Sequence, residues 1–523
     1  MTTAPKPDAR TRGRKRGLHV IEPNVPTDNL PAITTTDENG RRRPAVDMLI
    51  DIGLTASLFT DPAGDAFARI ERGGHVEFHP LESRAFRKWL AGRYYKLTAR
   101  GANAAALGDA LATLAAAADD AGDVRPVAMR TARDQLAVVL DTGLPNWQTI
   151  RCSGPGWALQ AGGDIAFRRP QKMLAFPAPT TGGQPAPEAF ARLWRYVNVA
   201  EEDRVLVAAF LLGALRPEGP YPLLLVAGEQ GTGKSTFSRI LKRLIDPSAA
   251  PLRPPPKEPR DVLVAALNSW LLCLDNLSFM PAELSDTLCR IATGGAIGER
   301  TLFSNVEETL IEVQRPMVLN GIAELATRPD LAQRGIHVEL QPGHQTRTES
   351  ELWRDFEDDA PAIFAALLAG LCRAIGQEDT TVVPGPMPRM ADFARWACAG
   401  LPALGFTPHE FAAAYGGNQA AGLRLGLESS TPGRAIARLM TARSEWNGTA
   451  TELLALLRDT TDPADLKARD WPASPRSLSA ALKRLAPALR AAGLSVQTGR
   501  TNRGSDIQLR RHSAHDTPDD NEF

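Results

Sequence analysis

The sequence predicts the α/β fold class: a phosphate-binding-loop core with an α+β domain before it, a helical extension after it and a small winged helix near the end. Three observations predict this. The apolar run 223–227 leads directly into a glycine-rich loop and then a helical pattern. Helices alternate with apolar strands up to about residue 340, as in an α/β sheet. At 523 residues the chain is also too long for one ordinary core, so several folded units are expected.

The glycine-rich loop has the spacing of a phosphate-binding loop. Because it joins a buried strand to a helix, its backbone N–H groups should converge on a point that a phosphate of ATP can fill. Its three glycines allow close approach, and its lysine would reach the β and γ phosphates. A plain glycine-rich turn is the weaker alternative in this context. The nucleotide would be lined by Gly228, Glu229, Gln230, Gly231, Thr232, Gly233, Lys234, Ser235 and Thr236.

A second motif predicts a metal site. The hydrophobic strand that begins at Trp270 ends at Asp275, which is the candidate Walker B carboxylate. The Ser235 hydroxyl and the Asp275 carboxylate would hold a Mg²⁺ ion that keeps most of its waters. One helix, a proline-rich loop and a second helix fit between Lys234 and Asp275, so the nucleotide core is compact and lacks an obvious substrate lid.

A third strand, 316–320, ends in a polar residue. Asn320 could orient the attacking water and sense the γ-phosphate. Taken alone, the pair Asn320-Gly321 reads as a plain turn. Its position after Asp275 in an alternating α/β series favours the sensor role.

Two arginines precede the next apolar strand, 336–340. A guanidinium in this segment could stabilise transition-state charge on a nucleotide held by a neighbouring subunit. Arg334 is the first candidate and Arg328 the second. Either could instead be a surface arginine that pairs with Asp330.

Composition names no partner, because Lys+Arg and Asp+Glu both number 60. The longest apolar candidate, 205–215, is shorter than the roughly 20 residues that span a bilayer, so no membrane partner is expected. The five cysteines are scattered and lack metal-ligand spacing, and the N-terminus lacks an apolar signal core. These features indicate a soluble protein of the cytoplasm.

Changes in composition divide the chain into seven segments. The basic start could contact nucleic acid or be a solvated tail, and both readings stay open. A proline- and glycine-rich stretch marks the linker before the core. The segments are 1–44 (disordered basic tail and linker), 45–175 (α+β domain), 176–187 (linker), 188–345 (phosphate-binding-loop ATPase core), 346–445 (helical extension), 446–511 (winged helix-turn-helix) and 512–523 (disordered tail).

The predicted α+β domain includes a basic helix that is rich in aromatic residues. Strands are expected at 66–70, 76–78, 136–140 and 157–160, with a long helix at 104–118. A basic helix between them carries four aromatic residues, Phe86, Trp89, Tyr94 and Tyr95. A core or interface role is favoured for them, and a platform that stacks nucleic-acid bases is the alternative.

Segment 446–511 predicts three helices followed by two strands and a basic loop. This order is typical of a winged helix, which binds duplex DNA or serves as a protein contact. If it binds DNA, the charges that contact phosphates would be Arg476, Lys483, Arg484 and Arg490 on the third helix and Arg500 and Arg503 at the tip of the wing.

Several runs resemble a known group. Asp275-Asn-Leu-Ser, Leu284 to Gly295, Arg300-Thr-Leu-Phe, Arg315 to Ile322 and Arg328 to Arg334 are similar to the ATP-binding proteins of bacterial prophages and integrative elements. The core of those proteins is in turn similar to AAA+ ATPases of helicase superfamily 3, especially the poxvirus-type primase-helicase group. The resemblance is specific over 188–345, looser in the helical extension and winged helix, and least specific in the first 180 residues.

The resemblance implies a Mg²⁺-ATP-dependent motor that acts in DNA replication. It implies a homo-oligomeric ring, expected to be a hexamer, that holds single-stranded DNA in its pore. Thr293 and Arg300 occupy the place of a segment that contacts DNA in that superfamily. In the ring, Arg334 would complete the ATP site of the next subunit.

One departure from the family concerns the catalytic base. Asn276 stands where these helicases commonly have a second acidic residue, and an amide cannot take a proton from water. Glu229 could serve instead, and the base remains unassigned. Asp141 alone does not make a primase site, so no polymerising activity is predicted.

Two other functions are compatible with these features. A nucleotide-gated regulatory or defence ATPase would use ATP to assemble without unwinding DNA, and Asn276 favours this reading slightly. A transcription regulator would bind one operator through the winged helix with little ATP turnover.

Overall fold

The computed structural model describes residues 33–300, 308–321, 331, 334–342, 347–468, 470–501 and 504–511, and for 296–300, 308–311, 500–501 and 504–505 it describes the backbone alone. The predicted tails 1–32 and 512–523 lie outside these ranges. Two compact units are present: residues up to 60 together with 66–123, and residues 61–65 together with the chain from 124 onward. Each unit is described by itself below.

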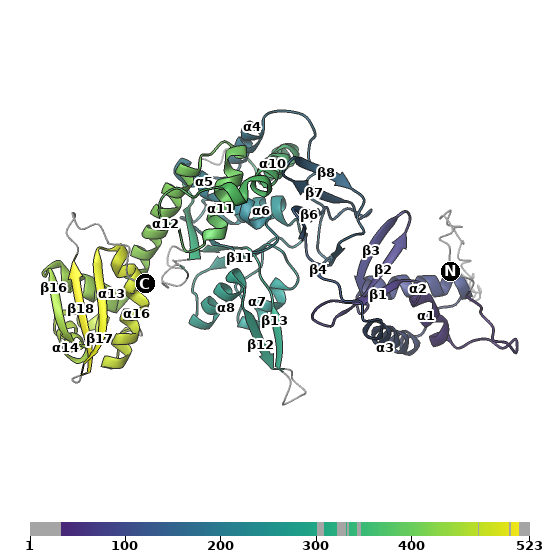
Figure 1. Cartoon of the computed structure of the whole chain (residues 1–523), viewed down its shortest axis with the longest axis horizontal. Coiled ribbons are helices and arrows are strands. Elements are labelled where there is room, and N and C mark those ends of the chain that lie inside the picture. Colours follow the sequence, from purple (N-terminus) through teal and green to yellow (C-terminus); the bar gives the residue numbers. More distant parts are fainter. Residues whose placement is uncertain are drawn as a thin grey trace, which may run out of the picture. The chain divides into compact units, whose positions relative to one another are not determined.

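The first unit packs three helices against a small antiparallel sheet (Figure 1). The predicted strands and the long helix of this region are present. The elements are α1 (Ala45–Gly53), β1 (Ser57–Thr60), β2 (Ala66–Arg72), β3 (His75–Pro80), α2 (Arg84–Thr98) and α3 (Ala104–Asp120). Their apolar side chains form one core that includes Leu49, Ile70 and Leu114.

The four aromatic residues of α2 have different environments. Phe86 and Tyr94 are buried in the core, and Trp89 is half-buried against Phe86 with ring centroids 5.3 Å apart. Tyr95 is 60% exposed. The core role therefore holds for Phe86 and Tyr94, whereas Tyr95 faces solvent.

The second unit begins with an antiparallel sheet, β5-β6-β7-β8, made of Thr131–Asp134, Ala137–Asp141, Thr149–Ser153 and Gly156–Gln160. Two short strands, β4 (Val127–Ala128) and β9 (Ala166–Phe167), pair beside it. The predicted segment 45–175 is thus divided between the two units. The reason is packing: Leu140 and Ile150 share a core with the distant helix α10 (Glu349–Gln377).

The centre of the second unit is a parallel sheet with the order β11-β14-β10-β15. Its strands are β10 (Leu223–Ala227), β11 (Leu272–Leu277), β14 (Met317–Gly321) and β15 (Gly335–Glu339). Successive residues of β10 enter two different cores: Leu224 and Val226 one, Leu223 and Leu225 the other. Burial on both faces explains why this strand is a continuous apolar run.

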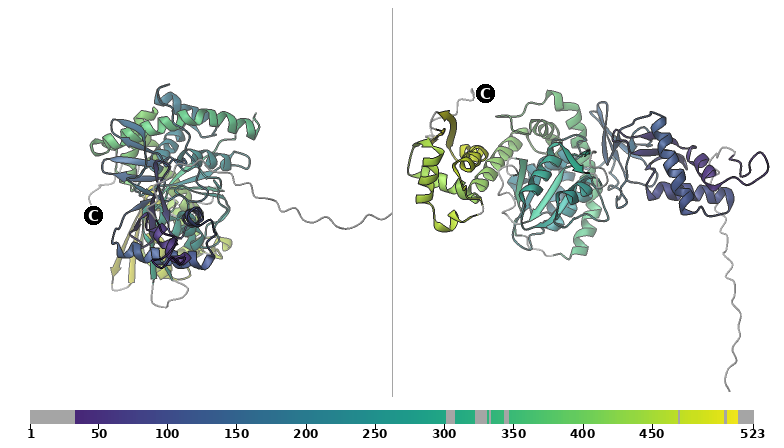
Figure 2. Two further views of the ribbon diagram at one scale, coloured as in Figure 1. Left: turned by 90° about the vertical axis from the view of Figure 1, so that its right-hand side faces the viewer. Right: turned by 90° about the horizontal axis from the view of Figure 1, so that it is seen from below.

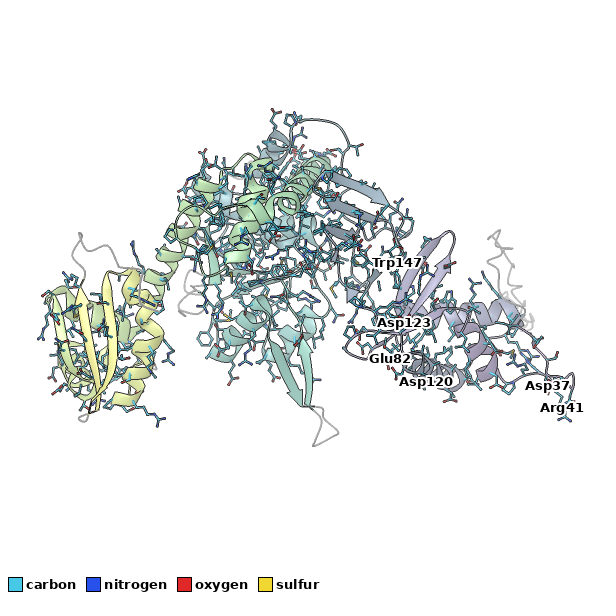
Figure 3. All side chains as sticks on the ribbon, viewed as in Figure 1. Asp37, Arg41, Glu82, Asp120, Asp123 and Trp147 are labelled. Atoms are coloured by element: carbon cyan, nitrogen blue, oxygen red, sulfur yellow. The ribbon has the colours of Figure 1, made fainter. Side chains whose placement is uncertain are left out.

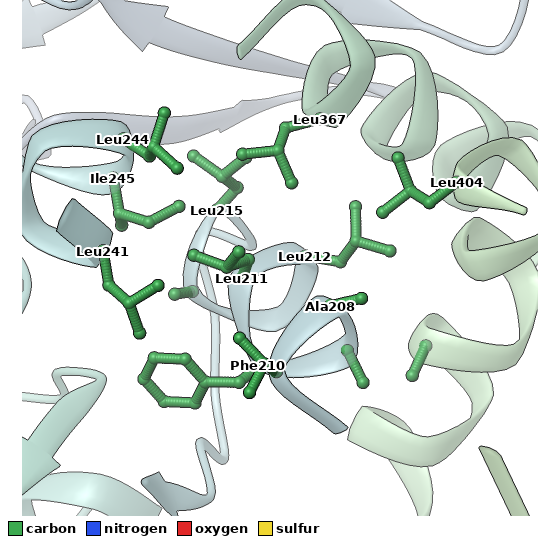
Figure 4. Close-up of a cluster of buried hydrophobic side chains, with 14 of the residues drawn as sticks. Ala208, Phe210, Leu211, Leu212, Leu215, Leu241, Leu244, Ile245, Leu367 and Leu404 are labelled. Atoms are coloured by element: carbon green, nitrogen blue, oxygen red, sulfur yellow. The ribbon is translucent and has the colours of Figure 1, made fainter. Parts of the chain in front are cut away.

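Helices cover the sheet, and the views in Figure 2 show its strands among them. Besides α10, they are α4 (Ala186–Ala191), α5 (Arg204–Ala214), α6 (Lys234–Ile245), α7 (Pro259–Ala266), α8 (Ala282–Thr293), α11 (Ala391–Gly400) and α12 (Pro408–Ser429), with short 3-10 turns at Arg192–Arg195, Glu201–Asp203, Glu378–Thr380 and Leu401–Leu404. The apolar helix α5 lies in the middle, where Leu211 and Leu212 meet side chains of α6 and α10 such as Leu241 and Leu367 (Figure 4).

Among the described helices, the stretch Glu349–Thr380 that contains α10 is long and apolar enough to cross a membrane by length and composition. More than half of its apolar window is buried inside the fold. This burial is the pattern of a core helix.

A buried polar network ties the antiparallel sheet to α6. The Asp246 carboxylate, at the end of α6, accepts hydrogen bonds from Arg130 Nε at 3.0 Å and Lys242 Nζ at 2.6 Å. The Arg130 guanidinium is fully buried and also donates to the Leu174 and Pro247 carbonyls. Burial by itself raises the pKa of Asp246, but Lys242 and Arg130 outweigh it and hold this pKa below its usual range.

Both edges of the parallel sheet are covered by the chain itself. At the β15 edge, the Asn418 amide accepts from the His337 N–H at 2.8 Å and donates to the His337 carbonyl at 2.6 Å. At the β11 edge, Arg253 donates its N–H to the Cys273 carbonyl and accepts from the Asp275 N–H.

The C-terminal part of the second unit has its own core, which includes Ile436, Leu482 and Leu509. Its elements are α13 (Thr431–Thr441), β16 (Glu445–Thr449), α14 (Ala450–Thr460), α15 (Pro463–Leu466), α16 (Pro475–Ala491), β17 (Leu494–Thr501) and β18 (Gly504–Arg511). The three predicted helices and two strands are present. The sheet order β16-β18-β17 adds a strand, and α13 joins this core although the segment was predicted to begin at 446.

Candidate nucleotide-binding site

The loop after β10 is shaped by its glycines. Gly228, Gly231 and Gly233 have φ values of 143°, 90° and 88°, which residues with a Cβ rarely adopt. α6 begins at Lys234, three residues before the predicted start at Phe237, so the loop's N–H groups lead straight into a helix N-terminus. A turn of this kind can surround an anion.

Gly228→Ala is expected to weaken nucleotide binding, because a Cβ there would lie 2.8 Å from Thr232 Oγ1 and 3.0 Å from the Leu340 carbonyl at an unfavourable φ. We expect roughly a tenfold or larger rise in the Kd of a fluorescent ATP analogue, since a strained residue costs on the order of 1–3 kcal/mol. Gly416→Ala on α12, where a Cβ meets nothing within 4 Å, is the matched control. Equal affinities in the two variants would contradict the assignment of the loop.

Three predicted residues meet at this loop. Lys234 Nζ donates to the carbonyls of Gly228 at 2.7 Å and Glu229 at 2.8 Å. The Ser235 hydroxyl donates to the Asp275 carboxylate, with oxygens 2.9 and 3.2 Å away. Ser235 and Asp275 lie 40 residues apart in sequence, so the fold places them together.

Asp275 is fixed from two sides. Its N–H donates to the Arg253 carbonyl at 2.8 Å. The pairing of β11 with β14 shifts register between Leu274 and Leu277, and within this irregularity Asn276 has a left-handed φ of 59°. Asparagine tolerates that conformation better than most residues. The side chain of Asn276 is consequently exposed beside the site.

Asn320 connects β14 to both neighbouring motifs. Its side-chain oxygen Oδ1 accepts a hydrogen bond from the Asn276 N–H at 2.8 Å, and its side-chain nitrogen Nδ2 donates one to Ser238 Oγ at 3.1 Å. Ser238 Oγ in turn donates to the Lys234 carbonyl. With 1% exposure, Asn320 holds the Asp275 segment and α6 in a fixed relation.

Arg334 lies at the opposite end of the sheet from the loop. It directly precedes β15, whose first residue Gly335 pairs with Leu223, whereas the loop follows Ala227. At about 3.3 Å per residue, four residues of strand separate the two ends. Arg334 is therefore remote from the loop of its own chain. The second candidate, Arg328, lies outside the described residues.

The residues present fit a magnesium nucleotide. Ser235 and Asp275 offer adjacent oxygen ligands at the helix N-terminus, and Gly231 and Gly233 leave open space where a Cβ would stand. No group of three His, Cys, Asp or Glu side chains in the described ranges could hold a metal. Mg²⁺ in nucleotide sites commonly takes one or two protein ligands and completes its shell with phosphates and waters.

Two further residues contribute to the site although no sequence motif predicts them. Asn198 Nδ2 donates to the Thr232 carbonyl at 3.2 Å and supports the loop from outside. Ser238 links Asn320 to α6, as described above. Neither lies in a recognisable motif, because each acts on a segment distant in sequence, and no signal in one sequence marks such pairs.

The residues that were predicted to contact DNA belong to segments that follow the glycine loop in the sequence, from Thr293 onward. The Thr293 hydroxyl donates to the Cys289 carbonyl at the end of α8, just before the hairpin β12 (Ala296–Arg300) and β13 (Glu308–Glu312). The side chains of Arg300 and Arg500, and all of Arg503, lie outside the described residues. On α16, the four predicted basic residues are all exposed, and Arg476, Lys483 and Arg490 recur every seven residues along one face.

Comparison with known families gives two matches. Residues 190–415 match the family described as actinomycete integrative conjugative element replication protein. Residues 433–519 match the C-terminal domain of the same replication proteins, described as the AICE RepA C-terminal domain. Together the two matches take in the parallel sheet with its loop, the helices after it and the C-terminal core. No curated protein matches the chain.

Among solved structures, the chain resembles apo forms of the NrS-1 C-terminal region. One has 10% identity and a TM-score of 0.37 and covers 89% of this chain and 98% of that chain. A second has 11% identity and a TM-score of 0.35, with 90% and 100% covered.

Proposed function

We propose, from the match to the actinomycete integrative conjugative element replication proteins, that this chain is a replication protein of such an element and works as a Mg²⁺-ATP-dependent ATPase on DNA. The family match supports the replication of a mobile element. The ATPase assignment rests on one observation, the convergence of Lys234, Ser235 and Asp275 at the glycine loop.

In this proposal the chain's own residues bind and orient the nucleotide. The loop N–H groups and Lys234 hold the phosphates, and Ser235 and Asp275 hold Mg²⁺, which neutralises phosphate charge when bound. Asn320 positions Asp275 and α6 through Asn276 and Ser238. The sheet order β11-β14-β10-β15 supports an AAA+ type core, since the sensor strand lies between the loop strand and the Walker B strand.

The same proposal makes hydrolysis depend on a neighbouring subunit. Arg334 lies at the far end of β15 from its own loop, so its guanidinium would serve the site of the next subunit in a ring, expected to be a hexamer. The outcome is an ATP site completed only at an interface.

DNA would be held at two places in the proposed motor. The order α13, β16, α14, α15, α16, β17 and β18 supports a winged helix, whose exposed basic face on α16 fits duplex DNA. The β12–β13 hairpin after Thr293 would hold single strands in the ring pore, in the place that the superfamily 3 resemblance assigns.

A second candidate is a nucleotide-gated switch, which the exposed Asn276 favours. ATP hydrolysis by the purified full chain, measured with and without single-stranded DNA, separates the two. Stimulation by single strands supports the motor. If DNA leaves the rate unchanged while ATP alters the oligomeric state, the switch replaces it.

Arg334→Ala is expected to lower ATP turnover about 10³-fold, the scale of a lost arginine finger, while nucleotide affinity is kept. Mixing this variant with Lys234→Ala should restore part of the turnover, because each variant supplies the half-site that the other lacks. Arg373→Ala, an exposed arginine of α10, is the control. If mixing restores nothing although both variants enter one oligomer, Arg334 does not act between subunits.

A further inference from the structure

The solvent face of α2 in the first unit carries one sign of charge. The helix contains five basic residues and no acidic one. Four of the basic side chains, together with an exposed tyrosine, face solvent, and we call this set the α2 basic face. They are Arg84, Arg87, Lys88, Lys96 and Tyr95. Arg84, Lys88 and Tyr95 share one side of the helix, and Arg87 and Lys96 lie on its two flanks.

These basic side chains are unpaired, unlike other arginines of the same unit. Arg43, Arg69 and Arg72 form ion pairs with Asp51, Glu71 and Glu77 at 2.6, 2.8 and 3.8 Å. Within the described residues, no hydrogen bond or ion pair engages a basic side chain of the α2 basic face. The unit's acidic residues that Figure 3 labels, Asp37, Glu82, Asp120 and Asp123, lie outside the helix.

The positions of these charges do not stabilise the helix α2. The first turn contains Arg84 and Arg87 and no acidic residue, although cations near a helix N-terminus are unfavourable. Ser83 already caps the helix by accepting from the Phe86 N–H at 3.1 Å. An external anion would relieve this charge, which internal pairing does not do.

Tyr95 distinguishes this face from an ordinary solvated helix surface. Tyr95 is 60% exposed, whereas Phe86 and Tyr94 of the same helix are buried in the core. Lys88 and Tyr95 lie seven residues apart, two helical turns, so cation and ring occupy the same face. Phosphate-binding cations beside an exposed ring are what single-stranded nucleic acid requires, because its unpaired bases can stack on aromatic side chains.

We infer that the α2 basic face binds single-stranded DNA, with Arg84, Arg87, Lys88 and Lys96 contacting phosphates and Tyr95 stacking on a base. This site lies in the first unit, outside both family matches and outside the proposed ATP site. Through this site the replication protein would bind single-stranded DNA without a bound nucleotide.

Photocrosslinking and binding with the full chain test this site. A single-stranded oligonucleotide that carries iodo-deoxyuridine should crosslink to the peptide containing Tyr95. Tyr95→Ala should weaken single-strand binding about tenfold, whereas Tyr95→Phe keeps the ring and the affinity. Arg87→Ala/Lys88→Ala should lower the slope of log K against log salt by about 1.4, near 0.7 for each phosphate contact.

Arg373→Ala/Arg395→Ala removes two exposed arginines from α10 and α11 and is the matched control. The site is wrong if this control and the α2 variants bind the single-stranded oligonucleotide equally well. It is also wrong if no crosslink falls within residues 84–100. If duplex DNA crosslinks as well as single-stranded DNA, and loses as much affinity in the α2 variants, the site is not specific for single strands. Lys234→Ala should leave the crosslink intact, so failure of the ATPase proposal is distinguishable from failure of this one.

Discussion

Replacing Lys234 with alanine is expected to lower the rate of ATP hydrolysis by about 10²- to 10³-fold, the scale of removing one preorganised group that stabilises transition-state charge. The Nζ atom is held at the loop by the carbonyls of Gly228 and Glu229. A bound phosphate would offer this ammonium group a stronger, charge-assisted partner than either carbonyl. The variant should also bind ATP more weakly.

The steady-state rate of phosphate release, with and without single-stranded DNA, measures this loss. Lys257→Ala removes an exposed lysine from the same unit and should keep the full rate. The thermal unfolding of Lys234→Ala should stay close to that of the parent, since the hydrogen bonds of Lys234 Nζ are to carbonyls of the loop. A Lys234→Ala protein that still hydrolyses ATP at the parent rate would refute the assignment of the site.

The second large effect concerns stability. Asp246→Ala should lower the free energy of unfolding by about 3–5 kcal/mol, because Arg130 and Lys242 would remain buried without their carboxylate. Urea unfolding of the second unit measures the change. Glu349→Gln breaks an exposed pair with Arg239, in which Glu349 is 67% exposed, and should cost no more than about 1 kcal/mol.

The Asp246 effect should depend on pH in one direction. Its pKa is lowered in the folded protein, so its contribution is complete above the ordinary carboxyl pKa and is lost as pH falls through the lowered value. The difference in stability between the parent and Asp246→Ala should therefore shrink in acid. A difference that stays constant from neutral pH into strong acid would contradict the ion-pair origin.

The sequence predicted the parts of the fold that depend on local pattern. The glycine loop and its two neighbouring strands are bounded by glycines or polar residues. β10 has its predicted bounds, 223–227, and β15 (Gly335–Glu339) lies one residue before the predicted 336–340. The helix after the loop was placed late because Lys234 to Thr236 are polar and carry no apolar periodicity.

What the sequence left open depends on long-range contact. The first unit ends at 123 because the next strands pack on α10, more than 200 residues away. Strand β16 was missed because the run 445–449 has a single buried apolar residue, Trp446, and is a strand only through pairing with β18. Asn320 was predicted as a sensor, yet its bonds to Asn276 and Ser238 could not be foreseen.

The covered edges of the parallel sheet limit how copies of this chain could associate. Exposed strand edges invite pairing with another chain. Here the Asn418 amide is hydrogen-bonded to the backbone N–H and carbonyl of His337 on β15. The Arg253 backbone is hydrogen-bonded to the Asp275 N–H and the Cys273 carbonyl on β11. At these positions a second copy of the chain cannot add a strand to the sheet. In the proposed ring, contacts at these edges would be made by side chains, so that each interface could open and close as its nucleotide changes.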